Sequence, residues 1–196
     1  PCVGRCEHAP VAVVGQRPIA HANLPVVADL VEHRMVDYGP LEAWIRLEAY
    51  RRENGYEVFR RCRDGSLDHE KVLTELESSE LRGLGGAGFP AGRKWRILRK
   101  QEAPRLMAVN IDEGEPGTFK DRYYLERDPH RFLEGLLIAA EIIGIDCCYL
   151  YVRDEYPGVL TVLQESIGEL QEEFGDQLPK LNLRRGAGAY ICGEES

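Results

Sequence analysis

Five glycines fall within residues 83–92, and the basic pair Arg93-Lys94 follows them. Without side chains, the backbone amides of such a loop can approach an anion closely, and a helix that starts near Pro90 would add its positive end. The spacing G-x-G-x-x-G occurs within the run, but the preceding residues are polar, which excludes a dinucleotide-binding turn after a buried strand. The run predicts a cradle for a phosphate or a cofactor, and a flexible connector is the alternative.

A second candidate lies in residues 110–117, where Asp112, Glu113 and Glu115 place three carboxylates within four positions. Carboxylates this dense repel phosphate, but they can accept hydrogen bonds from sugar hydroxyls, ring N–H groups or a carboxamide, or bind a hard cation. The ligand spacing of a calcium loop is absent. A solvated acidic turn is the alternative interpretation.

Residues 185–196 show the same combination of small and acidic residues. Their glycines and alanines permit close approach of the backbone, Tyr190 can stack on a ring, and Glu194 and Glu195 can accept hydroxyl groups. A glycine loop for a phosphate and two acidic segments for sugars and rings together suit a nucleotide-like cofactor.

Cys2 and Cys6 provide only half of a metal site, because iron–sulfur clusters need four ligands and C-x-x-x-C is an uncommon zinc spacing. Cys147 and Cys148 fall in an apolar run, so we expect them to pack as small hydrophobic residues. Four histidines are expected to be exposed or to cap helices: His21, His33, His69 and His130.

Strands and helices that alternate must position these segments. Apolar runs predict strands over residues 106–109, 147–152 and 181–184. This alternation predicts an α/β fold with a parallel sheet covered by helices, in which ligands bind at the carboxyl ends of the strands. Residues 110–117 follow the first of these strands directly, so a site is expected there first.

Two long helices carry clear boundary signals. One is expected to begin at Pro129 after the capping residue Asp128 and to end at Gly144, and the other to run from Pro157 to about residue 174. Shorter helices are predicted over residues 25–34, capped by Asn23, and over residues 41–51, 58–63 and 68–77.

The composition limits the class of protein. The chain has 196 residues, 25 of them basic and 33 acidic, and a formal net charge of −8, which disfavours a general nucleic-acid binder. No apolar run reaches the roughly 20 residues of a membrane span and no signal peptide opens the chain, so the cytoplasm is the expected location. Because the chain opens at Pro1 and stops after a glycine-rich run, we expect both ends to lie inside folded modules.

Three long motifs in the same order, residues 81–95, 110–122 and 185–195, closely resemble the flavin subunit of respiratory complex I and its relatives. These relatives are the diaphorase subunits of NAD-reducing hydrogenases and of soluble NAD-dependent formate dehydrogenases. Residues 2–14 resemble the end of a thioredoxin-like [2Fe–2S] domain, whose last two ligands have this C-x-x-x-C spacing. In complex I that domain is usually a separate subunit, so its fusion here favours the formate dehydrogenase or hydrogenase relatives.

The resemblance implies a domain organisation. Residues 1–36 would be the C-terminal part of the thioredoxin-like domain, residues 37–66 a connector, and residues 67–196 the N-terminal part of a Rossmann-like FMN- and NADH-binding domain. The ligands of a further [4Fe–4S] cluster and part of the flavin site would follow Ser196, so this piece alone is expected to be inactive and to retain FMN poorly.

The resemblance also implies roles for individual residues. The FMN phosphate and ribityl side would be held by Gly83, Gly85, Gly86 and Lys94. The flavin would be lined by Asn110, Asp112 and Glu113, with Tyr190 and Gly193 packed near it. NADH would be held by Phe89, Glu115, Glu194 and Glu195. The [2Fe–2S] cluster would take Cys2 and Cys6 as two of its ligands.

The implied function is a diaphorase that moves a hydride between NAD(H) and FMN and passes single electrons to iron–sulfur clusters. No acid–base side chain is obligatory, and Glu115 would assist. The expected partners are NADH and the redox subunits of a formate dehydrogenase, with a hydrogenase or complex I, at the cytoplasmic face of the membrane, as alternatives. We expect no nucleic-acid partner and no direct membrane insertion. The rival from another class is a non-catalytic subunit that binds a nucleotide for assembly.

Overall fold

The computed structural model describes residues 2–84 and 87–193. Its centre is a parallel sheet of three strands in the order β3-β4-β5, formed by β3 (Leu106–Ile111), β4 (Cys147–Val152) and β5 (Lys180–Arg185). The strands are in register, since Ile111 pairs with Val152 and Val152 with Arg185. The three carboxyl ends therefore lie side by side, as the sequence predicted for a ligand-binding edge.

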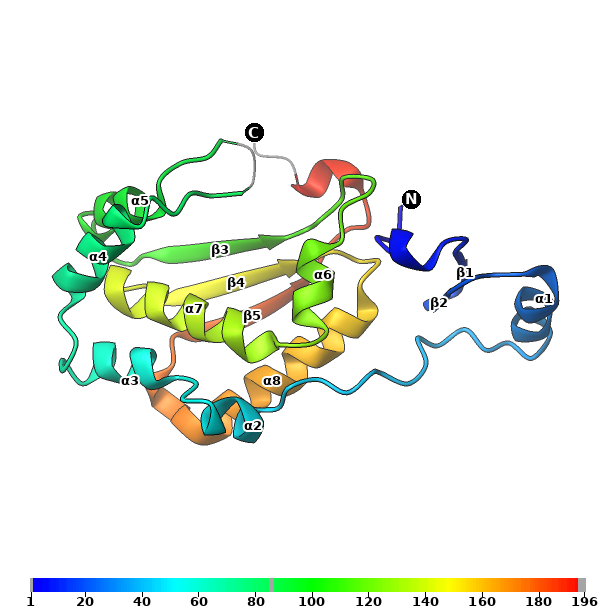
Figure 1. The fold of residues 1–196 in the computed structure, drawn as a ribbon, viewed down its shortest axis with the longest axis horizontal. Coiled ribbons are helices and arrows are strands. Elements are labelled where there is room, and N and C mark those ends of the chain that lie inside the picture. The colour runs from blue at the N-terminus through cyan, green and yellow to red at the C-terminus, as the bar shows by residue number, and fades with distance from the viewer. Residues whose placement is uncertain (1, 85–86, 194–196) are drawn as a thin grey trace.

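Two long helices connect these strands and cover one face of the sheet (Figure 1). α7 (Pro129–Ile143) begins after Asp128, whose side chain accepts a hydrogen bond from the Arg131 amide, and ends at Gly144 in the left-handed region. α8 (Pro157–Phe174) ends before Gly175. The predicted helix boundaries are thus confirmed, because capping residues and glycines specify them locally.

The core fills the space between these helices and the sheet. Alternate strand residues point into it, including Ile111, Cys148, Leu150 and Val152, which are buried against apolar residues of α7 and α8. The intervening residues point to the opposite face, where Leu106 is 63% exposed and Tyr149 is 36% exposed. The α/β class with a parallel sheet is confirmed, and both crossover helices lie on one face of the sheet.

Two short helices before the sheet belong to the same core. α2 (Leu47–Arg52) and α3 (Glu57–Arg63) contribute the buried rings of Tyr50, Tyr56 and Phe59. The second half of the segment expected to be a connector therefore packs on α7 and α8.

The prediction of a helix over residues 41–51 was wrong at its start. Residues 41–46 are not helical, and α2 begins at Leu47. Contacts with distant residues explain the difference: Ile45 donates its amide to the Arg127 carbonyl at 2.9 Å, and Glu169 accepts the Leu47 amide at 3.1 Å.

The prediction that His130 is exposed or capping was also wrong. His130 is fully buried in the first turn of α7. Its Nδ1 lies 2.9 Å from the Tyr56 hydroxyl and its Nε2 lies 2.9 Å from Glu169. The ring is buried because two polar partners from other elements satisfy both of its nitrogens.

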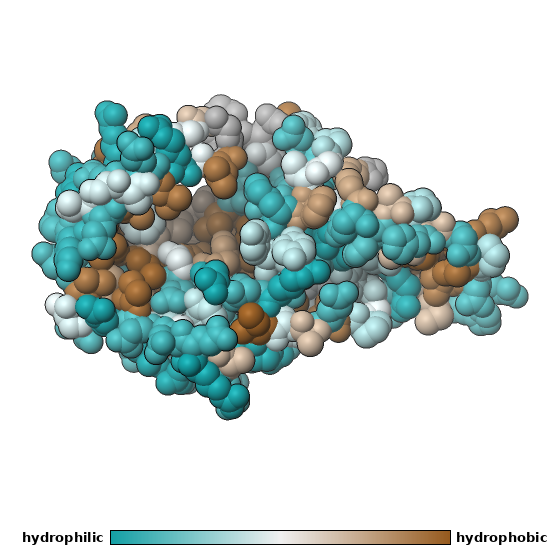
Figure 2. All heavy atoms as spheres, viewed as in Figure 1, coloured by the Kyte–Doolittle hydropathy of each residue, from teal (hydrophilic) through white to brown (hydrophobic). Residues whose placement is uncertain are grey.

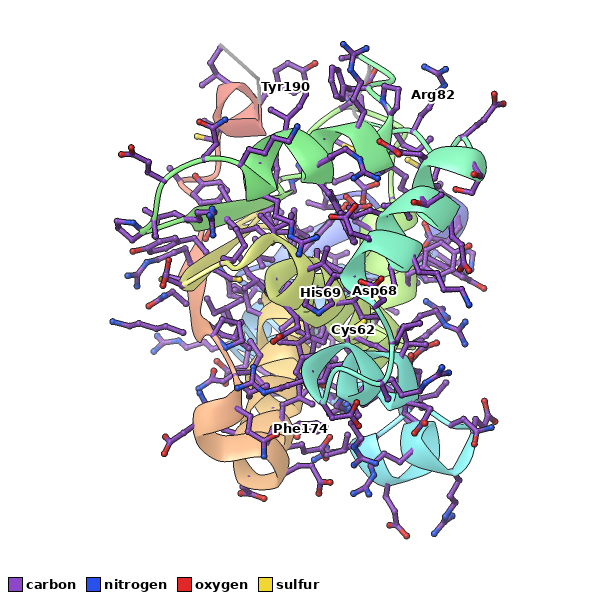
Figure 3. The ribbon with its side chains drawn as sticks, turned by 90° about the vertical axis from the view of Figure 1, so that its left-hand side faces the viewer. Cys62, Asp68, His69, Arg82, Phe174 and Tyr190 are labelled. Atoms are coloured by element: carbon purple, nitrogen blue, oxygen red, sulfur yellow. The ribbon has the colours of Figure 1, made fainter. Side chains whose placement is uncertain are left out.

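The remaining helices and turns of the domain lie around the sheet. α4 (His69–Ser78) packs against α5 (Ala91–Arg99), and α6 (Lys120–Leu125) follows the acidic segment. His69 lies beside the Cys62 carbonyl at 3.0 Å, where α3 meets α4 (Figure 3). Two short 3₁₀ turns, η2 (Gly175–Gln177) and η3 (Tyr190–Gly193), complete this part of the chain.

Residues 2–36 form an arm that projects from the side toward which the strands point (Figure 1). The arm contains η1 (Cys6–His8), an antiparallel pair of β1 (Ala12–Val14) and β2 (Arg17–Ile19), and α1 (Leu24–Glu32). Asn23 caps α1 by accepting the Val26 amide, as predicted. In the space-filling view the body tapers into this arm (Figure 2).

Within residues 2–84 and 87–193, no helix is long and apolar enough to cross a membrane.

Candidate functional site

The carboxyl edge of the sheet brings two of the predicted segments together. Asn110, near the end of β3, donates from Nδ2 to the Gly193 carbonyl at 3.0 Å. Its Oδ1 accepts the amide of Asp112 at 3.0 Å. One side chain therefore connects the acidic segment to the second glycine turn.

Glycine is required where these two segments meet. A Cβ atom at Gly193 would lie 2.5 Å from the Asp112 carbonyl oxygen, which is far inside van der Waals contact. A Cβ atom at Gly114 would lie 3.4 Å from the ring of Tyr190. The structure thus brings Asn110, Asp112, Tyr190 and Gly193 close together, and their binding of a flavin stays a prediction.

Asp112 carries the strongest sign of a missing ligand. Its Oδ2 atom is buried and has no hydrogen-bond partner within the part of the chain that the structure describes. Burial raises the pKa of this carboxyl group, while Arg153 opposes the shift. A buried carboxylate oxygen without a donor is costly, so the site is suited to a ligand that supplies an N–H or O–H group.

Glu113 has a structural role that the sequence did not indicate. Its carboxylate is buried, accepts the Asp121 amide at 3.2 Å at the start of α6, and accepts the Tyr156 hydroxyl at 3.1 Å. The side chain therefore points to α6, and its expected place beside a flavin stays a prediction. Glu115, two residues later, is exposed.

The glycine loop folds back on itself before α5. The amide of Gly83 donates to the Phe89 carbonyl at 3.0 Å, and the amide of Ala91 donates to the Leu81 carbonyl at 2.8 Å. The predicted helix start near Pro90 is confirmed, since α5 begins at Ala91. This arrangement presents the first turn of a nine-residue helix to the loop.

The side chains predicted to hold NADH (Phe89) and the FMN phosphate (Lys94) are accessible on this loop and helix. Phe89 is 43% exposed and lies 5.9 Å from the Arg93 guanidinium, and Lys94 is exposed. The other predicted residues of the loop and of the second turn, Gly85, Gly86, Glu194 and Glu195, lie outside the described residues.

The glycine loop and the second glycine turn lie at the same end of the molecule. Arg82 and Tyr190 are both at the top of the view in Figure 3, whereas Phe174 is near the bottom. The space-filling view shows a hollow over β3, below the glycine loop, with hydrophobic residues at its floor (Figure 2).

α4 holds α5 in position, which the sequence did not indicate. Arg96 of α5 forms two 3.0 Å hydrogen bonds with the two carboxylate oxygens of Glu77, and a third of 2.7 Å with Glu70. Gly92 lets the helices touch, since a Cβ atom there would lie 2.7 Å from the Glu77 amide nitrogen. The helix that follows the glycine loop is therefore fixed by a second helix.

Cys2 and Cys6 lie at this same edge of the sheet. Hydrogen bonds from the backbone amides of Gly4 and Gly117 hold the pKa of the Cys2 thiol below its usual value, and the Cys6 thiol is a further contact. Gly117 ends the acidic segment, so Cys2 lies beside that segment. Within the described residues no group of three or more His, Cys, Asp or Glu side chains is placed to hold a metal ion.

Arg122 and Arg153 were missed by the sequence analysis. Both are almost completely buried, although they carry charge. Arg122 ends a motif of the resemblance, but its partners in residues 2–7 are more than a hundred positions away. No local pattern in the sequence marks such a pairing.

Comparison with known proteins agrees with this geometry. The sequence model of a protein family described as "Nuo51 FMN-binding domain" matches residues 76–196. An NADH-quinone oxidoreductase subunit of Aquifex aeolicus is 39% identical over 158 residues, which cover 76% of this chain and 37% of that protein. The mitochondrial NADH-ubiquinone oxidoreductase 51 kDa subunit of Neurospora crassa is 41% identical over 144 residues, covering 65% and 29%.

A solved structure extends the similarity over the whole chain. The crystal structure of an NAD⁺-reducing [NiFe]-hydrogenase in the air-oxidized state has a TM-score of 0.80 and 33% identity, and the match covers all of this chain and 36% of that one. The chain therefore spans just over a third of the length of the Aquifex protein and of the hydrogenase chain. The match of the family model over most of the chain and the shared fold show that this chain belongs to the Nuo51 FMN-binding domain family.

Proposed function

We propose that this chain is part of an NADH:acceptor oxidoreductase subunit, a diaphorase, that transfers a hydride between NAD(H) and FMN and passes single electrons to iron–sulfur clusters. Membership of a family described as FMN-binding supports the proposal. The observation that carries it is the buried Oδ2 atom of Asp112, which has no donor among the described residues although it lies where two predicted flavin segments meet.

The residues present fit FMN. The amides of the glycine loop, the first turn of α5 and the exposed Lys94 offer positive charge to a phosphate. Asn110 and Asp112 offer polar atoms to the ring or the ribityl chain, and Tyr190 offers an aromatic face. Bound FMN would supply the hydride chemistry, while these residues position it and shield it from water.

The nicotinamide cofactor is proposed to bind over the same hollow. Phe89 and Glu115 are exposed and available to it, and Glu194 and Glu195 are proposed to accept hydrogen bonds from its ribose hydroxyls. The same carboxylates would repel the extra phosphate of NADPH, so the proposal includes a preference for NADH.

The residues of the arm fit half of a [2Fe–2S] cluster. Cys2 and Cys6 supply two sulfur ligands, and the Gly4 amide donates to the Cys2 sulfur at 3.5 Å. N–H donors of this kind stabilise the negative charge on cluster ligands. The other two ligands and those of a [4Fe–4S] cluster are proposed to lie in other parts of the protein.

The electron partner is proposed to be a soluble dehydrogenase or hydrogenase. The structure of the NAD⁺-reducing hydrogenase chain matches this chain over its full length, arm included. This match supports a partner of the hydrogenase type, and the formate dehydrogenase partner rests on the resemblance of residues 2–14 alone. An assay of the native complex distinguishes the hydrogenase, formate dehydrogenase and complex I partners. It measures whether NAD⁺ is reduced when H₂, formate or a quinol is the electron donor.

The test of the proposed function uses the full-length protein. Anaerobic addition of NADH should bleach the absorbance of bound flavin near its visible maximum. A non-catalytic assembly subunit, the rival proposal, would bind the nucleotide without reduction of a flavin.

A further inference from the structure

Two arginines of the α/β domain hold the cysteine segment, residues 2–6. Arg153, directly after β4, donates from Nη2 to the Cys2 carbonyl. Arg122, in α6, donates from Nε to the Gly4 carbonyl at 2.9 Å. Both residues are buried, with 3% and 1% of their surfaces exposed. The guanidinium groups therefore make hydrogen bonds between the arm and the domain and do not face the solvent.

Arg153 bridges two parts of the chain that the proposed function assigns to different cofactors. Besides the Cys2 carbonyl, its Nη1 donates to the Glu113 carbonyl at 2.7 Å, and these two residues are 151 and 40 positions from it along the chain. Its Nε pairs with Glu155 at 2.9 Å, which balances the buried charge. Only arginine offers several donors in a fixed planar fork, so lysine cannot make both bridges.

Arg122 belongs to the same hydrogen-bond network between the cysteine segment and the acidic segment. Its backbone amide lies 3.4 Å from the Glu113 carboxylate, and its guanidinium pairs with Glu126 at 2.7 Å and with Glu7. The position of α6 and the position of the cysteine segment therefore both depend on the acidic segment around Glu113.

The contact leaves no room for a side chain at Gly4. This glycine has a φ of +60°, and a Cβ atom there would lie 3.0 Å from Cε1 of Tyr156, whose hydroxyl donates to Glu113. Within the cysteine segment itself, the Gly4 amide donates to the Cys2 sulfur at 3.5 Å. The cysteine segment and Glu113 are thus linked through the hydrogen bonds of two buried arginines.

We propose that Arg153, assisted by Arg122, is a positioning residue that locks the Cys2 ligand to the 113–117 loop, and so fixes the hydrogen bonds around the cluster relative to the flavin. This inference rests on the proposed function for the identity of the two cofactors. The physical consequence is specific: when Arg153 is lost, the Cys2 carbonyl is no longer held, and the turn that keeps the Gly4 amide on the Cys2 sulfur loosens. Fewer N–H donors at cluster sulfur atoms stabilise the reduced cluster less and lower its reduction potential.

The experiment uses the full-length protein with its cofactors and the variants Arg153→Met and Arg153→Lys. Redox titration followed by electron paramagnetic resonance should give a lower [2Fe–2S] potential in both variants, with flavin content unchanged. Hydrogen exchange at residues 3–8 should be faster by about tenfold or more, since local opening no longer breaks the Arg153 hydrogen bonds. Exchange in α7 should stay as slow as in the wild type, which shows that the fold is intact.

Arg63→Met is the matched control, because Arg63 also joins two elements, pairing with Glu141 of α7 at 2.7 Å, but lies in α3. It should leave the cluster potential and the exchange of residues 3–8 unchanged. A wild-type potential together with wild-type exchange at residues 3–8 in both Arg153 variants would overturn the inference. If the protein held no cluster, the proposed function would fail, but the exchange experiment would still decide whether Arg153 locks the segment.

Discussion

Asn110 and Gly193 are 83 residues apart in the chain and are joined by a 3.0 Å hydrogen bond at the carboxyl edge of the sheet. This bond joins the acidic segment after β3 to the glycine turn after β5. Parallel strands in register make it possible, because their carboxyl ends meet at one level. The candidate flavin site is thus a product of the topology and not of either motif alone.

Gly193→Ala should weaken FMN retention in the full-length protein. The added Cβ atom would lie 2.5 Å from the Asp112 carbonyl, so the turn must move away from the acidic segment and break the Asn110 hydrogen bond. The flavin remaining after extensive dialysis measures the effect. Flavin content equal to that of the wild type would show that the two segments do not need this contact.

Asp112→Asn should have opposite effects on stability and on binding. Burial raises the pKa of Asp112, so the folded state binds this proton more tightly than the unfolded state does. The free energy of unfolding of the FMN-free protein therefore falls as the pH rises from the unfolded pKa through the folded pKa. At pH values above the folded pKa it stays at this lower value. The variant should melt at a higher temperature than the FMN-free wild type at pH 7.

The pH dependence and FMN binding provide the check on Asp112. At about pH 2, well below the unfolded pKa of about 3.9, the wild-type carboxyl group is protonated in both states, so the difference in melting temperature should vanish there. FMN should bind the variant less tightly, because a carboxylate acceptor is lost. A variant that melts lower than the wild type at pH 7 and binds FMN equally well would contradict the role given to Asp112.

Gly92→Ala should loosen α4 from α5 and so disturb the glycine loop. The new Cβ atom would lie 2.7 Å from the Glu77 backbone nitrogen, which cannot rotate away as a flexible side chain could. Overpacking of this kind costs about 1–3 kcal/mol. Hydrogen exchange of the α4 amides should become faster, and FMN retention should fall.

Gly135→Ala is the matched control for Gly92. Gly135 lies inside α7, and nothing lies within 4 Å of an added Cβ atom. Alanine should therefore stabilise this helix by up to about 1 kcal/mol without any effect on FMN retention. Equal behaviour of the two variants would mean that the contact between α4 and α5 does not support the loop.

Lys94→Ala tests whether the glycine loop binds a phosphate. Lys94 is exposed in the first turn of α5, and a charge-assisted contact with a phosphate contributes roughly 1.5–3 kcal/mol. Its loss should weaken FMN retention by about ten- to a hundredfold, with the fold unchanged. FMN retention equal to that of the wild type after dialysis would show that Lys94 is an exposed side chain that does not bind the phosphate.

The sequence predicted those parts of the fold that local signals specify. Asp128, Pro129 and Gly144 define the limits of α7, and the apolar run at residues 147–152 coincides with β4. The start of α2 was missed because Glu169, 122 residues away, accepts the Leu47 amide and sets that boundary. A capping partner so distant leaves no local pattern.

In the candidate site, too, some features could be predicted from the sequence and others depend on distant contacts. The flavin roles of Asn110, Asp112, Tyr190 and Gly193 were expected from the family resemblance of their motifs, and the topology brings these residues together. The inward turn of Glu113 could not be predicted, because its partners on α6 and α8 become neighbours only in the folded chain. The buried arginines were missed for the same reason, since charge in a sequence normally indicates an exposed side chain.

The most direct test of the proposed diaphorase is anaerobic titration of the purified full-length protein with NADH and, separately, with NADPH. The account predicts bound FMN in a one-to-one ratio, which NADH bleaches at far lower concentration than NADPH does. A protein that binds no FMN, or one whose FMN stays oxidised in excess NADH, would contradict it.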